Sequence, residues 1–198
     1  MLDAGGRRGA ALTALLLLVS LTVVSCRLGG GGSDIDEANQ LNRSAGQDIS
    51  EIEKIVQENK DKESAVSRAL NAGGVDAARK MMDDSIKAID RGLEKGQSAA
   101  DKFGKAAKLD VDSTIKEYLS LRAQSVNRAI EAFKELRSGI IAFRDAAGNT
   151  DKAAAEKARS EIRRTSENFD KLINEAEKLE LRADEIARRN PDKIKPGK

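Results

Sequence analysis

The sequence predicts an all-α fold, with long helices packed as an up-down four-helix bundle or an antiparallel coiled coil. Charged residues make up 34% of the chain and aromatic residues 3%, with no Trp, no His and two Pro. This composition is typical of long helices. Apolar residues also recur at alternating spacings of three and four over four long segments, which keeps one apolar seam facing a partner helix. We therefore expect one helical domain, residues 34–190.

The four expected helices follow one another with short connections. Residues 34–70 form the first, which begins with the acidic run Asp34-Ile35-Asp36-Glu37, and residues 75–108 form the second. Residues 115–147 form the third, and residues 155–186 have the most regular spacing and form the fourth. Each is about 50 to 60 Å long at 1.5 Å per residue. Since short connections make neighbouring helices antiparallel, an up-down arrangement is the simplest.

The residues between these segments are typical of helix ends. Gly tolerates the left-handed conformation that ends a helix, Asp, Asn and Thr cap helix starts, and Pro cannot continue a helix. The predicted boundary residues are Gly73 and Gly74 after the first helix, Asp110 or Asp112 before the third, Asn149 or Thr150 before the fourth, and Pro191 after it. Residues 191–198 are then a C-terminal tail.

Several seam positions carry polar residues where apolar ones are expected. One interpretation is a polar core that binds a ligand, and the other is that these residues fix helix register at some cost in stability. These positions are Asn42, Asn59, Glu63, Arg122 and Thr165.

Charge and residue content exclude several classes of function. Without residues 1–25 the chain has 33 basic and 32 acidic residues, interspersed along its length. A nucleic-acid-binding protein is not expected, because it needs a basic excess on one face. The absence of His excludes Ser-His-Asp and Cys-His nucleophile systems. The Asp and Glu residues fall mostly on outward helix faces, whereas catalytic carboxylates are usually buried to raise their pKa. We expect no enzyme activity, no metal and no cofactor.

The N-terminal region has the organisation of an export signal. Arg7 and Arg8 form a short positive segment, followed by an apolar run over residues 10–24. That run matches the length of the apolar part of a signal peptide and is short for a transmembrane helix. The arginine pair leaves both the general and the twin-arginine export routes open. The run ends in Val23-Val24-Ser25-Cys26, which contains the only cysteine.

This tetrapeptide resembles the lipobox of bacterial lipoproteins, in which two aliphatic or small residues and a small residue precede an invariant Cys. The resemblance covers these four positions and the preceding signal. It implies cleavage between Ser25 and Cys26, diacylglycerol on the Cys26 sulfur and acylation of the new amino terminus. With several acyl chains, attachment to a membrane is effectively permanent. The resemblance also bears on location, because Asp directly after the cysteine would favour the inner membrane. The residue here is Arg27, which favours the outer membrane, facing the periplasm, if the source is Gram-negative.

Residues 26–33 are rich in Gly and are expected to be a flexible tether between Cys26 and the helices.

The predicted function is a membrane-anchored cell-envelope lipoprotein with a structural or protein-interaction role. Its partners are then the membrane, through the lipid anchor, and another protein or a second copy. The alternative is a bundle-type sensor or carrier of a small ligand in the periplasm, which needs a cavity of a few hundred Å³.

Overall fold

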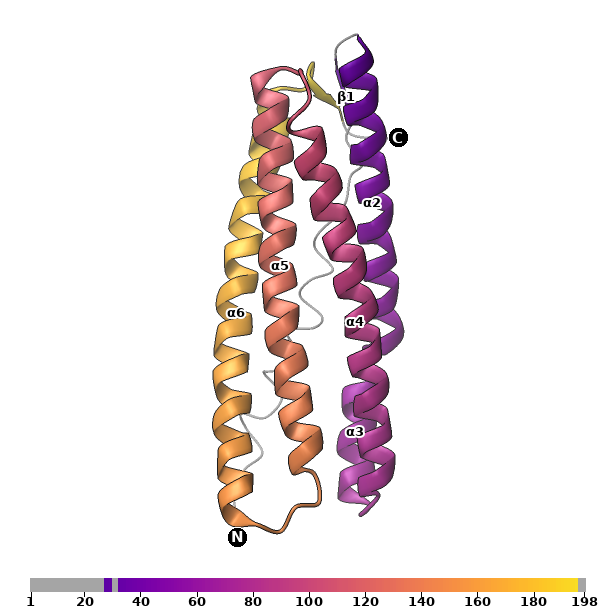
Figure 1. Cartoon of the computed structure of the whole chain (residues 1–198), viewed down its shortest axis with the longest axis vertical. Helices are drawn as coiled ribbons and strands as arrows, with labels where there is room; N and C mark the ends of the chain where they lie inside the picture. Colours follow the sequence, from indigo (N-terminus) through magenta and orange to yellow (C-terminus); the bar gives the residue numbers. More distant parts are fainter. Residues whose placement is uncertain (1–26, 30–31, 196–198) are drawn as a thin grey trace.

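The protein is described by a computed structural model that covers residues 27–29 and 32–195 (Figure 1). Ser25 and Cys26 lie outside the described residues, as does the rest of the predicted signal peptide. The described part contains helices α2 to α6 and two short strands. Their bounds are β1 Arg27–Leu28, α2 Ser33–Asn59, α3 Lys62–Asn71, α4 Val75–Ala106, α5 Ser113–Ala146, α6 Lys152–Arg189 and β2 Ile194–Lys195.

The four predicted helical segments are confirmed, with one correction. The first segment is not continuous, because α2 and α3 are separated by a turn at Lys60 and Asp61. Residues 57–64 contain no apolar side chain, so this stretch has nothing to bury in the seam. Since packing of an apolar face supplies most of the stability of a helix, the segment breaks there.

The helix ends follow the predicted chemistry in most places. Gly73 ends α3 with a φ of 77°, and Asp112 caps α5 by accepting a hydrogen bond from the Thr114 backbone N at 2.8 Å. The prediction for the last helix was wrong by one or two residues. Its cap is Asp151, whose carboxylate accepts from Ala153 N at 2.9 Å, while the side chain of Asn149 accepts from Asp151 N. A carboxylate can cap as well as an amide, so the choice depended on local backbone geometry.

The helices pack in chain order, which confirms the all-α helical bundle. Helix α4 packs against α2 and α3 on one side and α5 on the other, and α5 packs against α6. Figure 1 shows this order across the molecule, from α6 through α5 and α4 to α2. Among the described residues, α2 and α6 do not pack extensively against each other. The bundle is therefore open along the side between its first and last helices.

Both strands lie at one end of the bundle, which we call the strand end. Helices α2 and α5 begin there, and α4 and α6 end there (Figure 1). The main core cluster lies at this end and joins Leu28 and Ile194 of the strands to residues of all four long helices. The largest fully buried side chains include Tyr118, Phe103 and Phe169. The strands therefore close the core at the end where the described chain begins.

Two glycines allow close helix contacts. A Cβ at Gly96 of α4 would lie 3.0 Å from Ile130 of α5. At Gly139 of α5 it would lie 2.6 Å from the hydroxyl of Thr165 of α6. A Cβ at either position would force its neighbours to move, so these glycines set the spacing of α5 from both neighbouring helices.

Candidate functional site

The residue next to the predicted lipid attachment site is fixed to the bundle. Strand β1 pairs with β2 in antiparallel register, with Arg27 opposite Lys195 and Leu28 opposite Ile194. The Asn39 amide of α2 donates to the Leu28 carbonyl at 3.0 Å, and its oxygen accepts from the Leu28 backbone N at 2.7 Å. Leu28 is only 2% exposed. Both backbone polar groups of this buried residue are thus satisfied by one side chain, as burial requires.

Within the predicted flexible tether, residues 26–33, residues 27–29 pair with the C-terminal segment in place of forming a free linker. Gly29 donates a backbone hydrogen bond to the Lys193 carbonyl at 2.5 Å, and α2 already begins at Ser33. A Cβ at Gly29 would lie 2.3 Å from the Asp192 carbonyl oxygen, so only glycine permits this approach. Composition suggested a linker, whereas the glycine serves close backbone packing. Arg27, the residue after Cys26, is therefore the first residue of a strand that is fixed to the bundle.

Asp112 links the start of α5 to the segment before β2. Its carboxylate accepts hydrogen bonds from the Lys193 Nζ at 2.9 Å and from the Thr114 backbone N at 2.8 Å. The hydrogen bond from Lys193 is the largest cause of a lowered pKa, and those from Thr114 add to it. Together they lower the pKa of Asp112 from 3.8 to about 2.

This lowered pKa makes the contact sensitive to acid. A carboxyl group with a lowered folded-state pKa stabilises the fold fully above its ordinary pKa, here 3.8, and this contribution is lost as the pH falls through about 2. We expect an NMR titration of the Asp112 carboxyl carbon to have its midpoint near 2 and Lys193→Met to raise it toward 3.8. Equal midpoints in the two proteins would rule out the assigned cause.

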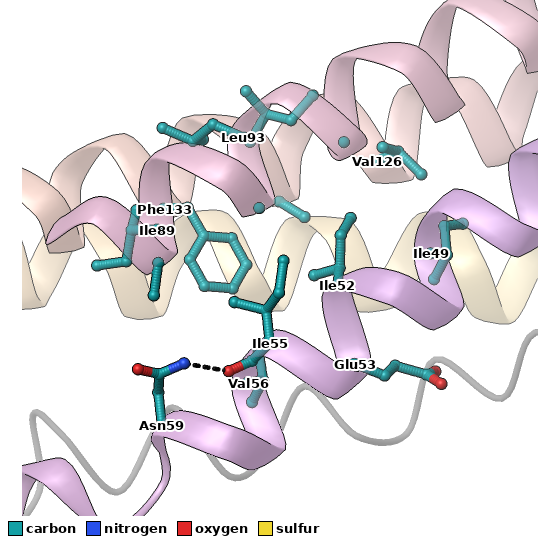
Figure 2. A pocket seen from close by; sticks show the side chains of 15 residues that line it. Ile49, Ile52, Glu53, Ile55, Val56, Asn59, Ile89, Leu93, Val126 and Phe133 are labelled. Carbon is teal, nitrogen blue, oxygen red and sulfur yellow. Dashed lines mark hydrogen bonds between the residues drawn. The ribbon is translucent and has the colours of Figure 1, made fainter. Parts of the chain in front are cut away.

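Side chains of α2, α4 and α5 line an apolar groove, and α6 contributes no lining residue. Figure 2 shows Ile52 and Ile55 of α2 directed toward Ile89 and Leu93 of α4 and Phe133 of α5. Along α2 the lining runs from residue 49 to residue 59, which is about 15 Å of helix. The groove thus continues the apolar interior of the bundle out to its surface.

The groove lining is apolar except at two residues. Gly92 lies in the lining, and a Cβ there would meet nothing within 4 Å. Only Glu53 and Asn59 bring polar side chains. Burial raises the pKa of Glu53, and the Asn59 amide donates to the Ile55 carbonyl of its own helix at 2.6 Å (Figure 2). A ligand in this groove would meet mostly hydrocarbon.

The groove holds a cavity of about 80 Å³. Pockets for compact small ligands are typically about 300 to 1,000 Å³ and have several convergent polar groups. The volume of this groove is several times smaller, and only two of its lining side chains are polar. It therefore offers few hydrogen bonds to a compact polar molecule.

The polar seam residues have different roles. Arg122 of α5 forms an ion pair with Glu180 of α6, and their side chains are 3% and 10% exposed. The guanidinium carbon lies 5.3 Å from the centre of the Phe103 ring. Burial raises the pKa of Glu180, and the positive charge of Arg122 opposes this rise. For Arg122 the structure favours the interpretation that the residue fixes helix register, since its charge pairs with Glu180 of the neighbouring helix.

The remaining seam positions give no common ligand site. The Thr165 hydroxyl donates within its own helix, to the Glu161 or Ile162 carbonyl, each at 3.0 Å. Asn42 is buried in α2, Asn59 lies at the groove, and the side chain of Glu63 is outside the described residues. These residues are distributed along the bundle instead of meeting in one place.

No group of three or more potential metal ligands occurs within residues 27–29 and 32–195. In the same ranges, no helix combines the length and the apolar content needed to cross a membrane.

Comparisons with known proteins add no relative from which a function could be transferred. No protein-family model matches the chain, and no significant match was found among curated proteins or solved structures. The function therefore has to be argued from the residues of this chain.

Proposed function

We propose that this protein is a lipoprotein of the bacterial cell envelope, anchored through lipid on Cys26, whose helical body has a structural or protein-interaction role without catalysis. The observation that carries the proposal is the position of Val23-Val24-Ser25-Cys26 at the end of an apolar run. The fixed segment that begins at Arg27 supports it, because cleavage before Cys26 leaves the folded body intact.

The short connection between the anchor and the bundle determines how the helical body is held relative to the membrane. Because Arg27 is held by β2 and Leu28 by α2, the anchor is joined to the bundle without a long free linker. The far ends of the helices and their outer faces are then free to meet a partner. A rigid helical body held close to its membrane is suited to spacing or docking. We place it at the outer membrane facing the periplasm if the source is Gram-negative.

The proposal predicts that Cys26 is required for lipid attachment. In cells grown with labelled palmitate, we expect label on the wild-type protein and none on Cys26→Ala. The mature wild-type chain should begin at Cys26 by mass spectrometry and carry the added mass of its lipid, and it should fractionate with membranes. Ser33→Ala, which changes an exposed residue after the strand, should be labelled like the wild type. Equal labelling of Cys26→Ala, or no label on the wild type, would refute the anchor.

A further inference from the structure

The direction of β1 shows where the chain leading to Cys26 approaches the bundle. Leu28 is held by Asn39, and Arg27 borders a surface hollow whose lining on α2 runs from Ser33 to Arg43. Gly32, on the other side of β1, precedes the first residue of α2. Strand β1 therefore runs antiparallel to α2. From Leu28 to Arg27 the chain points along α2 toward its middle, away from the strand end.

That direction leads to the apolar groove. Asn39 and Glu53 are fourteen residues apart, so they lie on nearly the same face of α2. The groove lining begins at Ile49, which is ten residues beyond Asn39, or about 15 Å along the helix. An acyl chain attached at Cys26 therefore has to extend along α2 before it enters the groove.

We propose that one acyl chain of the Cys26 lipid occupies the groove between α2, α4 and α5 while the protein is outside a membrane. The inference rests on the proposed function, because it requires lipid on Cys26. The groove lies farther along α2 in the direction from Leu28 to Arg27, and its walls are mostly hydrocarbon. Its length along α2, about 15 Å, is shorter than an extended palmitoyl chain.

The enclosed cavity of about 80 Å³ has room for only a few methylene groups, so the rest of the chain has to lie along the open part of the groove. Gly92 lies in the lining, and a Cβ there would meet nothing within 4 Å. Each methylene removed from water adds to the stability of the complex in proportion to its area. In the membrane the same chain inserts into lipid, so the two environments compete for it. The groove therefore shields part of the lipid during transfer through water.

Photocrosslinking tests this directly on the full acylated protein. Cells are grown with a diazirine-bearing palmitate, the lipoprotein is purified, detergent is removed and the sample is irradiated. We expect adducts on groove residues, with Ile52, Ile55 and Leu93 as the main sites. Adducts confined to the strands or the outer faces would overturn the proposal and leave the anchor intact. Absence of label on Cys26 would overturn the anchor and this inference together.

Two glycine variants of α4 provide a matched pair. Gly92→Leu places a leucine side chain in the groove lining. Gly104→Leu places the same side chain outside the groove, and at both positions a Cβ would meet nothing within 4 Å. Leucine favours helix over glycine, so both variants should fold. If the new leucine displaces two methylenes of the acyl chain from the groove, the yield of adducts on groove residues should fall about tenfold in Gly92→Leu. Gly104→Leu should match the wild type, and equal adducts in both variants would contradict the site.

The same experiment separates a chain's own lipid from that of a second copy. Mixing isotopically heavy and light protein before irradiation distinguishes adducts within one chain from adducts between chains. We expect adducts only within one isotope. Adducts between heavy and light chains would show that the groove takes lipid from a second copy, which overturns the assignment made here.

Discussion

Replacing Glu180 with alanine should lower the free energy of unfolding by about 3 to 5 kcal/mol, because it leaves a buried arginine without its partner. Arg122 is 3% exposed, and its Nε already has no hydrogen-bond partner among the described residues. The Phe103 ring contacts the guanidinium but cannot replace a carboxylate. Urea denaturation of the full chain measures the loss, and a loss below about 1 kcal/mol would contradict the buried pair.

A double replacement distinguishes the net contribution of the ion pair to stability from the cost of leaving one buried charge without its partner. Arg122→Met with Glu180→Leu removes both charges and keeps apolar volume between α5 and α6. Burial raises the pKa of Glu180 although the adjacent Arg122 opposes the rise, so this site disfavours the charged carboxylate. We therefore expect the double variant to be about as stable as the wild type or more stable. Arg122→Met alone should be destabilised, because the carboxylate is then buried without its partner.

How far the sequence predicted the fold depends on the range of the interaction involved. The four helical segments could be predicted, since the three-and-four spacing of apolar residues is local and long. Arg122 was recognised as a polar seam position, but its partner Glu180 was not, because the two are 58 residues apart. Helix periodicity identifies which face of a helix is buried. It does not identify which residue of another helix lies opposite.

The strand pair and the groove were beyond sequence analysis for different reasons. Two-residue strands have no periodicity, and Gly29 in a glycine run resembles a linker although it packs against Asp192. Leu28, a large apolar residue within that run, was a signal that could have been used. The groove depends on how side chains of α2, α4 and α5 come together in three dimensions. At the sequence level Gly92 and Gly96 look equivalent, yet a Cβ at Gly96 would meet Ile130 at 3.0 Å and one at Gly92 would meet nothing within 4 Å.

Replacing Phe169 with alanine should destabilise the protein by about 3 to 5 kcal/mol through loss of buried area and creation of a cavity. Phe169 of α6 is 2% exposed and packs with Ala132 and Ile173. Its ring is 6.2 Å from that of Phe133, in an edge-to-face arrangement at 80°. Phe143→Ala is the control, because Phe143 is 38% exposed and should lose much less. Thermal and urea unfolding of the two variants make the comparison.

The Phe169 cavity also tests what holds the groove wall in place. Phe133 lines the groove and contacts Phe169 with its ring, so removing Phe169 takes away this contact with α6. A dry apolar cavity of this kind binds small apolar molecules, so benzene should raise the melting temperature of Phe169→Ala and leave the wild type nearly unchanged. If instead Phe133 moves into the void, benzene will have no effect and the loss of stability will be near the lower limit. The two outcomes distinguish a rigid groove wall from one that adapts to its contents.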